Sequence, residues 1–240
     1  IRLLNHNRVG AVGFDASGHD VRFRNTGDVE INAINSPTGT VELISNTGRI
    51  TQQASGGLVV GSLILDTANG VQLYNADNHI SRLDVVSRGN VSIITGASGW
   101  GGILDVTRID AAGHNVALSN NINGITGGNI TAGSLSVFGV LSIDLSTAND
   151  VTGTVHLSSR DIAFTNTGNL VLTGLIGNNG NAVLRSEQGA ISMTNGAIFA
   201  TDGLTAYGRD GVVLAGAIRR IDALSAGPGA DVFVASDYAL

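Results

Sequence analysis

Carboxylates, arginines and histidines are the side chains with which this chain can do chemistry. It contains 16 Asp and 3 Glu, its 13 basic residues are all Arg, and it has five His but no Cys. Because thiols and lysine amines are missing, cysteine nucleophiles, cysteine-ligated zinc, disulfides and Schiff bases are excluded. Acid–base chemistry by carboxylates is the remaining possibility.

Three pairs of carboxylates stand close together in the sequence, two of them beside an arginine. A glycoside hydrolase works with two carboxylates at matched positions, and a polysaccharide lyase needs a basic residue beside acidic calcium ligands. Either chemistry requires the fold to bring the carboxylates of a pair together. The pairs are Asp105 with Asp110 near Arg108, Asp144 with Asp150, and Asp202 with Asp210 near Arg209.

The histidines do not follow a metal-binding pattern. No two of them stand two or four positions apart, and none has carboxylates at ligand spacing. Isolated calcium sites at turns that contain Asn or Asp stay open. The sequence therefore predicts no catalytic residue, no cofactor and no metal site. The five residues are His6, His19, His79, His114 and His156.

A three-residue unit, apolar-polar-apolar, is the main repeat of the chain. One series begins with Val21-Arg22-Phe23 and recurs about every 20 residues, and a second, beginning with Val29-Glu30-Ile31, follows it by about eight. Because side chains alternate across a strand, the outer pair of each unit is expected in a core and the middle residue in water. The expected core residues include Val21, Phe23, Leu43, Leu73, Phe164, Leu172 and Leu214, and the expected outward residues include Arg22, Glu42, Gln72 and Val171.

A turn rich in Asn and Gly separates the two series, as in Asn25-Thr26-Gly27, Asn69-Gly70 and Asn166-Thr167-Gly168. Glycine, and less readily Asn, accepts a positive φ, which a sharp bend between short strands requires. We therefore expect left-handed backbone at these glycines. If Gly168 has a positive φ, Gly168→Val should cost roughly 1–3 kcal/mol.

Short strands at uniform spacing predict an all-β fold, a right-handed parallel β-helix in which residues about 20 apart stack. Such a β-solenoid would have roughly 11–12 coils of about 20 residues and run continuously over residues 1–240, as an internal fragment of a longer chain. A β-sandwich or barrel is the alternative, since Asn-Gly also marks hairpins. None of the carboxylate pairs has the stacking separation, so we interpret their members as solvated strand and turn residues.

The spacing becomes uneven between about residues 96 and 155, although units such as Leu104-Asp105-Val106 and Leu141-Ser142-Ile143 persist. We interpret this segment as about three coils with insertions in their turns. Its glycine-rich stretch Gly96–Gly102 holds Trp100, the only Trp of the chain. An aromatic ring on a glycine-rich loop suits contacts with sugars or proteins, so Trp100 is a candidate contact residue. The alternative is that the ring folds back over a neighbouring coil.

Charge and hydropathy argue against two classes of partner. The net charge is −6 and the arginines are scattered, so there is no basic footprint for nucleic acid. No apolar run approaches the roughly 18 residues of a membrane span, so membrane insertion is not expected.

Two stretches, residues 144–159 and 164–174, resemble repeats of filamentous-haemagglutinin-like surface proteins. The first contains Leu-Ser-Thr-Ala-Asn-Asp-Val-Thr-Gly-Thr-Val-His-Leu-Ser-Ser and the second Asn-Thr-Gly-Asn-Leu-Val-Leu. These are large Gram-negative exoproteins exported by two-partner secretion or autotransport. The resemblance implies a right-handed parallel β-helix, secretion, and location at the bacterial cell surface in association with the outer membrane. Because the Asn-Pro-Asn-type motifs of the family's secretion domain are missing, it implies a place in the repeat shaft.

Two functions from different classes follow. The first is a structural or adhesive rod that contacts a host or neighbouring-cell surface protein or glycan and continues end to end with further coils of the parent chain or a filament. The second is a carbohydrate-active β-helix enzyme, a lyase or glycoside hydrolase. A lateral groove with stacked carboxylates and Arg would distinguish the enzyme, and we expect the rod.

Overall fold

The computed structural model describes residues 1–96 and 102–237. These residues form strands and turns with no helix, and so no helix long and apolar enough to cross a membrane. The strands are β1 (Arg2–Asn7), β2 (Ala11–Asp15), β3 (Val21–Asn25), β4 (Val29–Ser45), β5 (Ile50–Gln52), β6 (Leu58–Thr67), β7 (Val71–Leu73), β8 (His79–Ser87), β9 (Val91–Thr95), β10 (Leu104–Asn120), β11 (Ile125–Gly127), β12 (Ile130–Gly139), β13 (Ser142–Val151), β14 (Thr154–Ser159), β15 (Asp161–Asn166), β16 (Leu170–Gly177), β17 (Asn181–Ser186), β18 (Ile191–Gly208), β19 (Val212–Ala226) and β20 (Val232–Ser236).

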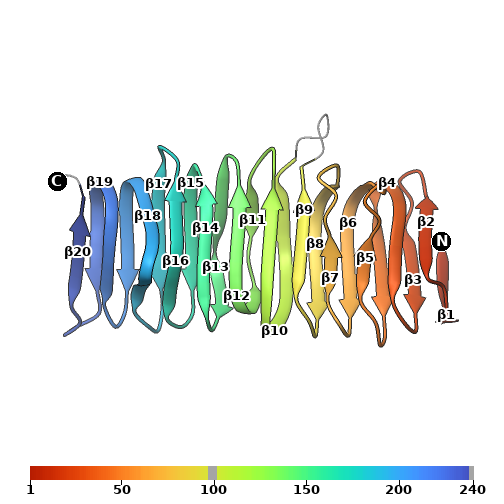
Figure 1. The fold of residues 1–240 in the computed structure, drawn as a ribbon, viewed down its shortest axis with the longest axis horizontal. Helices are drawn as coiled ribbons and strands as arrows, with labels where there is room; N and C mark the ends of the chain where they lie inside the picture. The colour runs from red at the N-terminus through yellow and green to blue at the C-terminus, as the bar shows by residue number, and fades with distance from the viewer. Residues whose placement is uncertain (97–101, 238–240) are drawn as a thin grey trace.

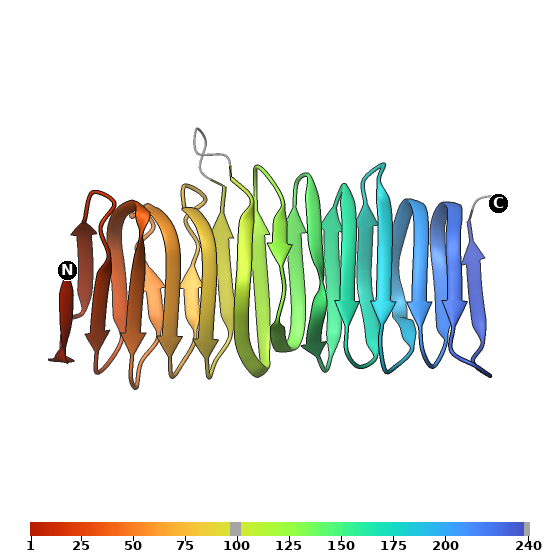
Figure 2. The ribbon, with the colours of Figure 1, turned by 180° about the vertical axis from the view of Figure 1, so that it is seen from behind.

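The strands wind into a rod, with β1 near one end and β20 near the other (Figure 1). Successive coils pair in parallel, and the described strands belong to one 20-stranded sheet. The chain makes about 11 turns spaced about 20 residues apart. Figure 2 shows the same stacking from behind. The predicted parallel β-solenoid is therefore confirmed.

Both series of repeat units stack as expected. In the first series Val21 pairs with Val41, which pairs with Leu63, and in the second Val29 pairs with Ile50. The expected core residues are at most 2% exposed, whereas Arg22, Glu42 and Val171 are half-buried and Gln72 is exposed. The alternation across each strand thus places one continuous apolar core inside the coils.

A third inward set completes each coil and was not anticipated. Ile34 and Ser36 on β4 pair with Leu58 and Val60 on β6, and all four are buried. The set escaped detection because a polar residue takes one of its inward positions and because β4 runs without a break into the next unit. Each coil therefore has more inward positions than two triplets provide.

The uneven segment also belongs to the solenoid. Leu104 pairs with Ile125, Ile125 with Ile143, and Ile143 with Ile162, which gives the three expected coils. In the unit Leu141-Ser142-Ile143, Ile143 is buried as expected, but the expectation for Leu141 is wrong. Leu141 is exposed because it lies in the turn that precedes β13.

A ladder of small polar side chains fills the bend between the two series. Ser45 Oγ donates a hydrogen bond to the Gly27 carbonyl at 2.8 Å, and Thr67 Oγ1 donates to the Gly48 carbonyl at 2.7 Å. Ser186 Oγ donates a hydrogen bond to the Gly168 carbonyl at 2.7 Å. Each buried hydroxyl thereby satisfies a turn carbonyl of the preceding coil.

The expected left-handed backbone occurs at only some turn glycines. Gly70 has φ +108° and Gly211 has φ +130°, and each directly precedes the first residue of a strand. Gly27 and Gly168 do not have positive φ, because one more residue separates each from its strand. The expectation for Gly168 is therefore wrong, and no Cβ contact within 4 Å would oppose a side chain there.

Candidate functional surfaces

The candidate contact residue Trp100 lies outside the described residues. Its proposed contact with sugars or proteins, and the alternative that its ring folds back over a coil, both stay predictions. The candidate carboxylates are all described, and they lie on outward positions and turns of the rod.

Asp105 and Asp110 do not form a pair. A register shift in β10 lies between them, so that Asp105 stacks on Arg82 and Asp110 on Val86. Asp105 Oδ2 is 3.5 Å from Arg82 Nε, and Arg108 pairs instead with Asp84 at 2.8 Å. Asp105 and Arg108 of this candidate group therefore take part in two separate cross-coil ion pairs.

The fold aligns candidate carboxylates that belong to different sequence pairs. Asp105 stacks on Thr126, which stacks on Asp144, and in a second row Asp110 stacks on Thr131, which stacks on Asp150. Two coil steps separate the acids of each row by about 10 Å. That is at the upper end of the carboxylate separation in inverting glycoside hydrolases. A threonine stands between the acids in both rows.

Asp202 lies within β18, whereas Asp210 lies beyond its end. Asp202 pairs with Arg219 at 3.0 Å beside a pocket of about 140 Å³. Asp210 and Arg209 lie in the turn that follows β18, and both are exposed. The three residues therefore do not form a site.

An exposed arginine near the C-terminal end is held by a carboxylate and an amide. Arg220 donates from Nη2 to Asp222 Oδ2 and to Asn181 Oδ1, both at 3.1 Å. Gly203 lies between Asn181 and Arg220 in the stack, and a Cβ there would come within 2.7 Å of atoms of all three residues. The hydrogen bond from Arg220, followed by its charge, lowers the pKa of Asp222.

Asp222 is expected to titrate below the ordinary aspartate value of about 3.9, and Arg220→Gln should move its midpoint back toward that value. Because the pKa of Asp222 is lower in the folded chain than in the unfolded chain, the ion pair stabilises the fold at pH values above the unfolded-state pKa. This stabilisation is lost as the pH falls through the folded-state pKa. Carboxyl-carbon NMR during an acid titration measures the midpoint. Arg185→Gln, at another ion pair, is the control and should leave it unchanged. An unshifted Asp222 midpoint in the native chain would contradict this assignment.

The histidines stay dispersed. His19 Nδ1 lies 2.9 Å from the Ala16 carbonyl, and His79 Nε2 lies 3.3 Å from Ser81 Oγ. Over the described part of the chain, no group of three or more His, Cys, Asp or Glu residues is arranged to hold a metal ion.

These features define a protein class by architecture alone, a parallel β-solenoid with ion-paired outer faces. Comparison with protein-family models, with curated proteins and with solved structures gives no match. The resemblance to filamentous-haemagglutinin-like repeats therefore stays a prediction.

Proposed function

We propose that this chain is a structural and adhesive rod segment of a secreted protein on the bacterial cell surface. The observation that carries the proposal is the uninterrupted apolar core, which joins coils from Val12 on β2 to Ile218 on β19. Each coil contacts its neighbours through backbone pairing and stacked Val, Leu and Ile, so the stack forms a stiff, elongated body. Such a body suits projection or lateral contact.

The ends of the rod support continuation with further coils. Leu3 in the first coil and Val232 in the last occupy inward positions, since they pair with the buried Phe23 and Val212. They are nevertheless 46% and 42% exposed. Further coils of the parent chain, or of a filament, would bury these side chains and complete the backbone pairing of the terminal strands.

Adhesion of coated beads tests the proposal. Beads that carry the chain should bind host epithelial cells or neighbouring bacterial cells in larger numbers than beads that carry an unrelated β-solenoid of similar charge. The partner is a surface protein or glycan of those cells. Equal binding of the two kinds of bead would refute the adhesive function and leave only the structural one.

The carboxylate rows are the one observation that favours the alternative, a carbohydrate-active enzyme. However, Asp110, Asp144 and Asp150 are exposed, whereas a general acid is made by setting a carboxyl group in an apolar pocket. Asp105 is engaged by Arg82. The rows therefore lack the environment that this chemistry uses.

Incubation with pectin, alginate or a neutral glucan is expected to release no new chain ends, with or without calcium. A reducing-end assay measures release, and the ultraviolet absorbance of newly formed unsaturated ends detects a lyase. Turnover that disappears on changing Asp105, Asp110, Asp202 or Asp210 to Asn would establish the enzyme instead.

A further inference from the structure

Five stacked strands carry a surface without Arg, Asp or Glu side chains along the middle of the rod. The outward positions of β9, β10, β12, β14 and β16 align in two rows. We call these ten positions the neutral strip. The first row is Ser92, Ala117, Ser136, His156 and Gly174, and the second is Ile94, Ser119, Phe138, Ser158 and Ile176.

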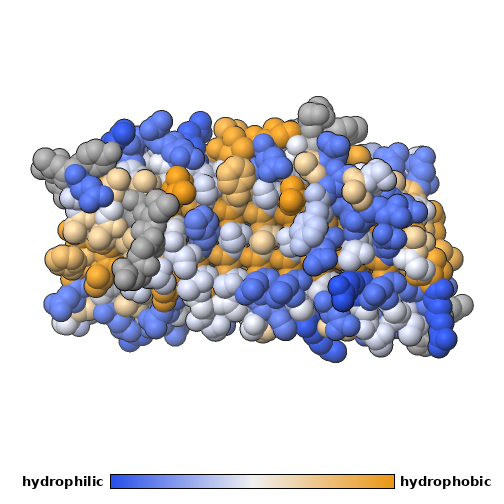
Figure 3. All heavy atoms as spheres, viewed as in Figure 1, coloured by the Kyte–Doolittle hydropathy of each residue, from blue (hydrophilic) through white to orange (hydrophobic). Residues whose placement is uncertain are grey.

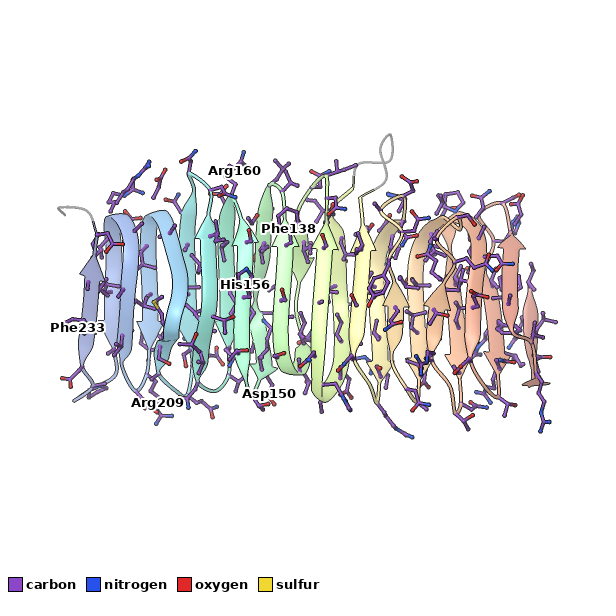
Figure 4. The ribbon with its side chains drawn as sticks, in the orientation of Figure 1. Phe138, Asp150, His156, Arg160, Arg209 and Phe233 are labelled. Carbon is purple, nitrogen blue, oxygen red and sulfur yellow. The ribbon has the colours of Figure 1, made fainter. Side chains whose placement is uncertain are left out.

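The strip differs from the other outward face of the same coils. There, Arg82 and Asp84 on β8 meet Asp105 and Arg108 on β10 in two ion pairs. The strip instead offers four serine hydroxyls, one imidazole and one aromatic ring. Figure 3 shows the middle of this face largely in white and orange, and Figure 4 places Phe138 and His156 on it.

Phe138 presents its ring to solvent. It stacks between Ser119 and Ser158, whose side chains are too short to cover a ring, and it is 42% exposed. An exposed aromatic ring gives a large, rigid apolar surface that loses little conformational entropy when it binds a ligand. The serines on either side supply hydroxyl groups next to it.

The imidazole of His156 lies over the glycine of the next coil. A Cβ on Gly174 would lie 2.5 Å from both Cε1 and Nδ1 of the imidazole, so the ring occupies the space that a side chain would take. His156 is half-buried on this outward face. Phe138 and His156 come from neighbouring strands, β12 and β14.

We propose that the neutral strip binds an uncharged glycan chain laid along the rod. Phe138 packs against the apolar face of a sugar ring, and His156 and the serines exchange hydrogen bonds with sugar hydroxyls. This inference rests on the adhesive function proposed above and names its ligand class.

The dimensions and charge of the strip favour a glycan over other partners. Five coils span about 19 Å, and the two rows stand about 7 Å apart, which matches a single extended chain. A protein partner needs about 800 Å² on each side, anchored by several aromatic or Arg residues, and the strip has one aromatic and no Arg. The net charge of −6 disfavours polyanionic glycans.

Titration calorimetry with soluble polysaccharides tests the ligand class. The probes are a neutral glucan, a neutral mannan and a neutral galactan, with heparin as the polyanionic comparator. We expect binding to at least one neutral polysaccharide and none to heparin. Binding to heparin alone, or to none of the four, overturns the proposal.

Variants test the location. Phe138→Ala should lower the affinity for the bound polysaccharide at least tenfold, and His156→Ala and Gly174→Ala should each lower it several-fold. Phe233→Ala removes a ring that is 60% exposed near the end of the rod and should leave the affinity unchanged. The melting temperature of the Phe138 variant should equal that of the native chain. Equal affinities for Phe138→Ala and the native chain overturn the proposal.

Bead adhesion with the same variants separates the strip from the general function. If native and Phe138→Ala beads adhere equally, adhesion stands and the neutral strip is wrong. If native beads do not adhere but Phe138→Ala abolishes glycan binding, the strip stands and adhesion is wrong. In a third case, native beads still adhere after neutral glycans are removed enzymatically from the target cells, and Phe138→Ala abolishes that adhesion. The strip then binds a protein, and the glycan proposal fails.

Discussion

Replacing Leu172 with aspartate is expected to lower the free energy of unfolding of its coils by about 4 kcal/mol or more. Leu172 is fully buried and stacks between Val155 on β14 and Met193 on β18. A carboxylate there would lose its hydration among apolar side chains, with no cation in the stack to compensate. The coil must then open or keep the carboxyl group protonated.

Hydrogen exchange read by mass spectrometry is the appropriate measurement. Because each coil contacts only its neighbours, the increase in exchange rate should be largest in β14, β16 and β18. It should become smaller along the rod toward β3. Val171→Asp is the matched control, since Val171 is the adjacent, half-buried outward residue of the same strand. It should change stability by less than about 1 kcal/mol. Equal destabilisation by the two variants would contradict the inward assignment of Leu172.

The core was predictable because burial in this fold depends on two local quantities, alternation and spacing. Val21, Phe23 and Leu172 could be placed inside from their own units alone. The prediction was wrong at Leu141, because the pattern apolar-polar-apolar begins in the turn before β13, where Leu141 is exposed, although Ile143 of the same unit is buried. Alternation therefore identifies inward residues only after the start of each strand is known.

The outer surface was less predictable because coil lengths vary. Arg22 and Glu42 are 20 residues apart, but Arg108 and Asp84 are 24 apart. Counting in steps of 20 therefore misses that ion pair. Asp105 and Asp144 are 39 residues apart, which is about two steps, so a search confined to single steps does not connect them. Ser136 and His156 both belong to the neutral strip, but only the register shows that they are neighbours.

The turn glycines show most clearly what composition alone leaves open. Every turn between the two series looked equivalent, yet a positive φ is found at Gly70 and not at Gly168. Gly70 directly precedes Val71, so the chain must reverse within that one residue, whereas Asn169 shares the bend after Gly168. In the turns between the two series, a positive φ is therefore found where the glycine directly precedes the strand, and the residue type alone does not decide it.

Gly70→Val is accordingly expected to lower the free energy of unfolding by about 3 kcal/mol or more, whereas Gly168→Val should stay within about 1 kcal/mol of the native chain. At Gly70 a β-branched side chain would meet a φ of +108°, and its Cβ would lie 2.6 Å from the Asn90 carbonyl oxygen. That oxygen accepts the Val71 N–H at 2.9 Å, so it cannot move away without breaking the pairing of two coils. For a chain of this size, the loss of about 3 kcal/mol expected for Gly70→Val corresponds to a fall of roughly 6–12 °C in melting temperature. A thermal melt of both variants measures it. Equal melting temperatures for the two variants would show that the two turns share one conformation after all.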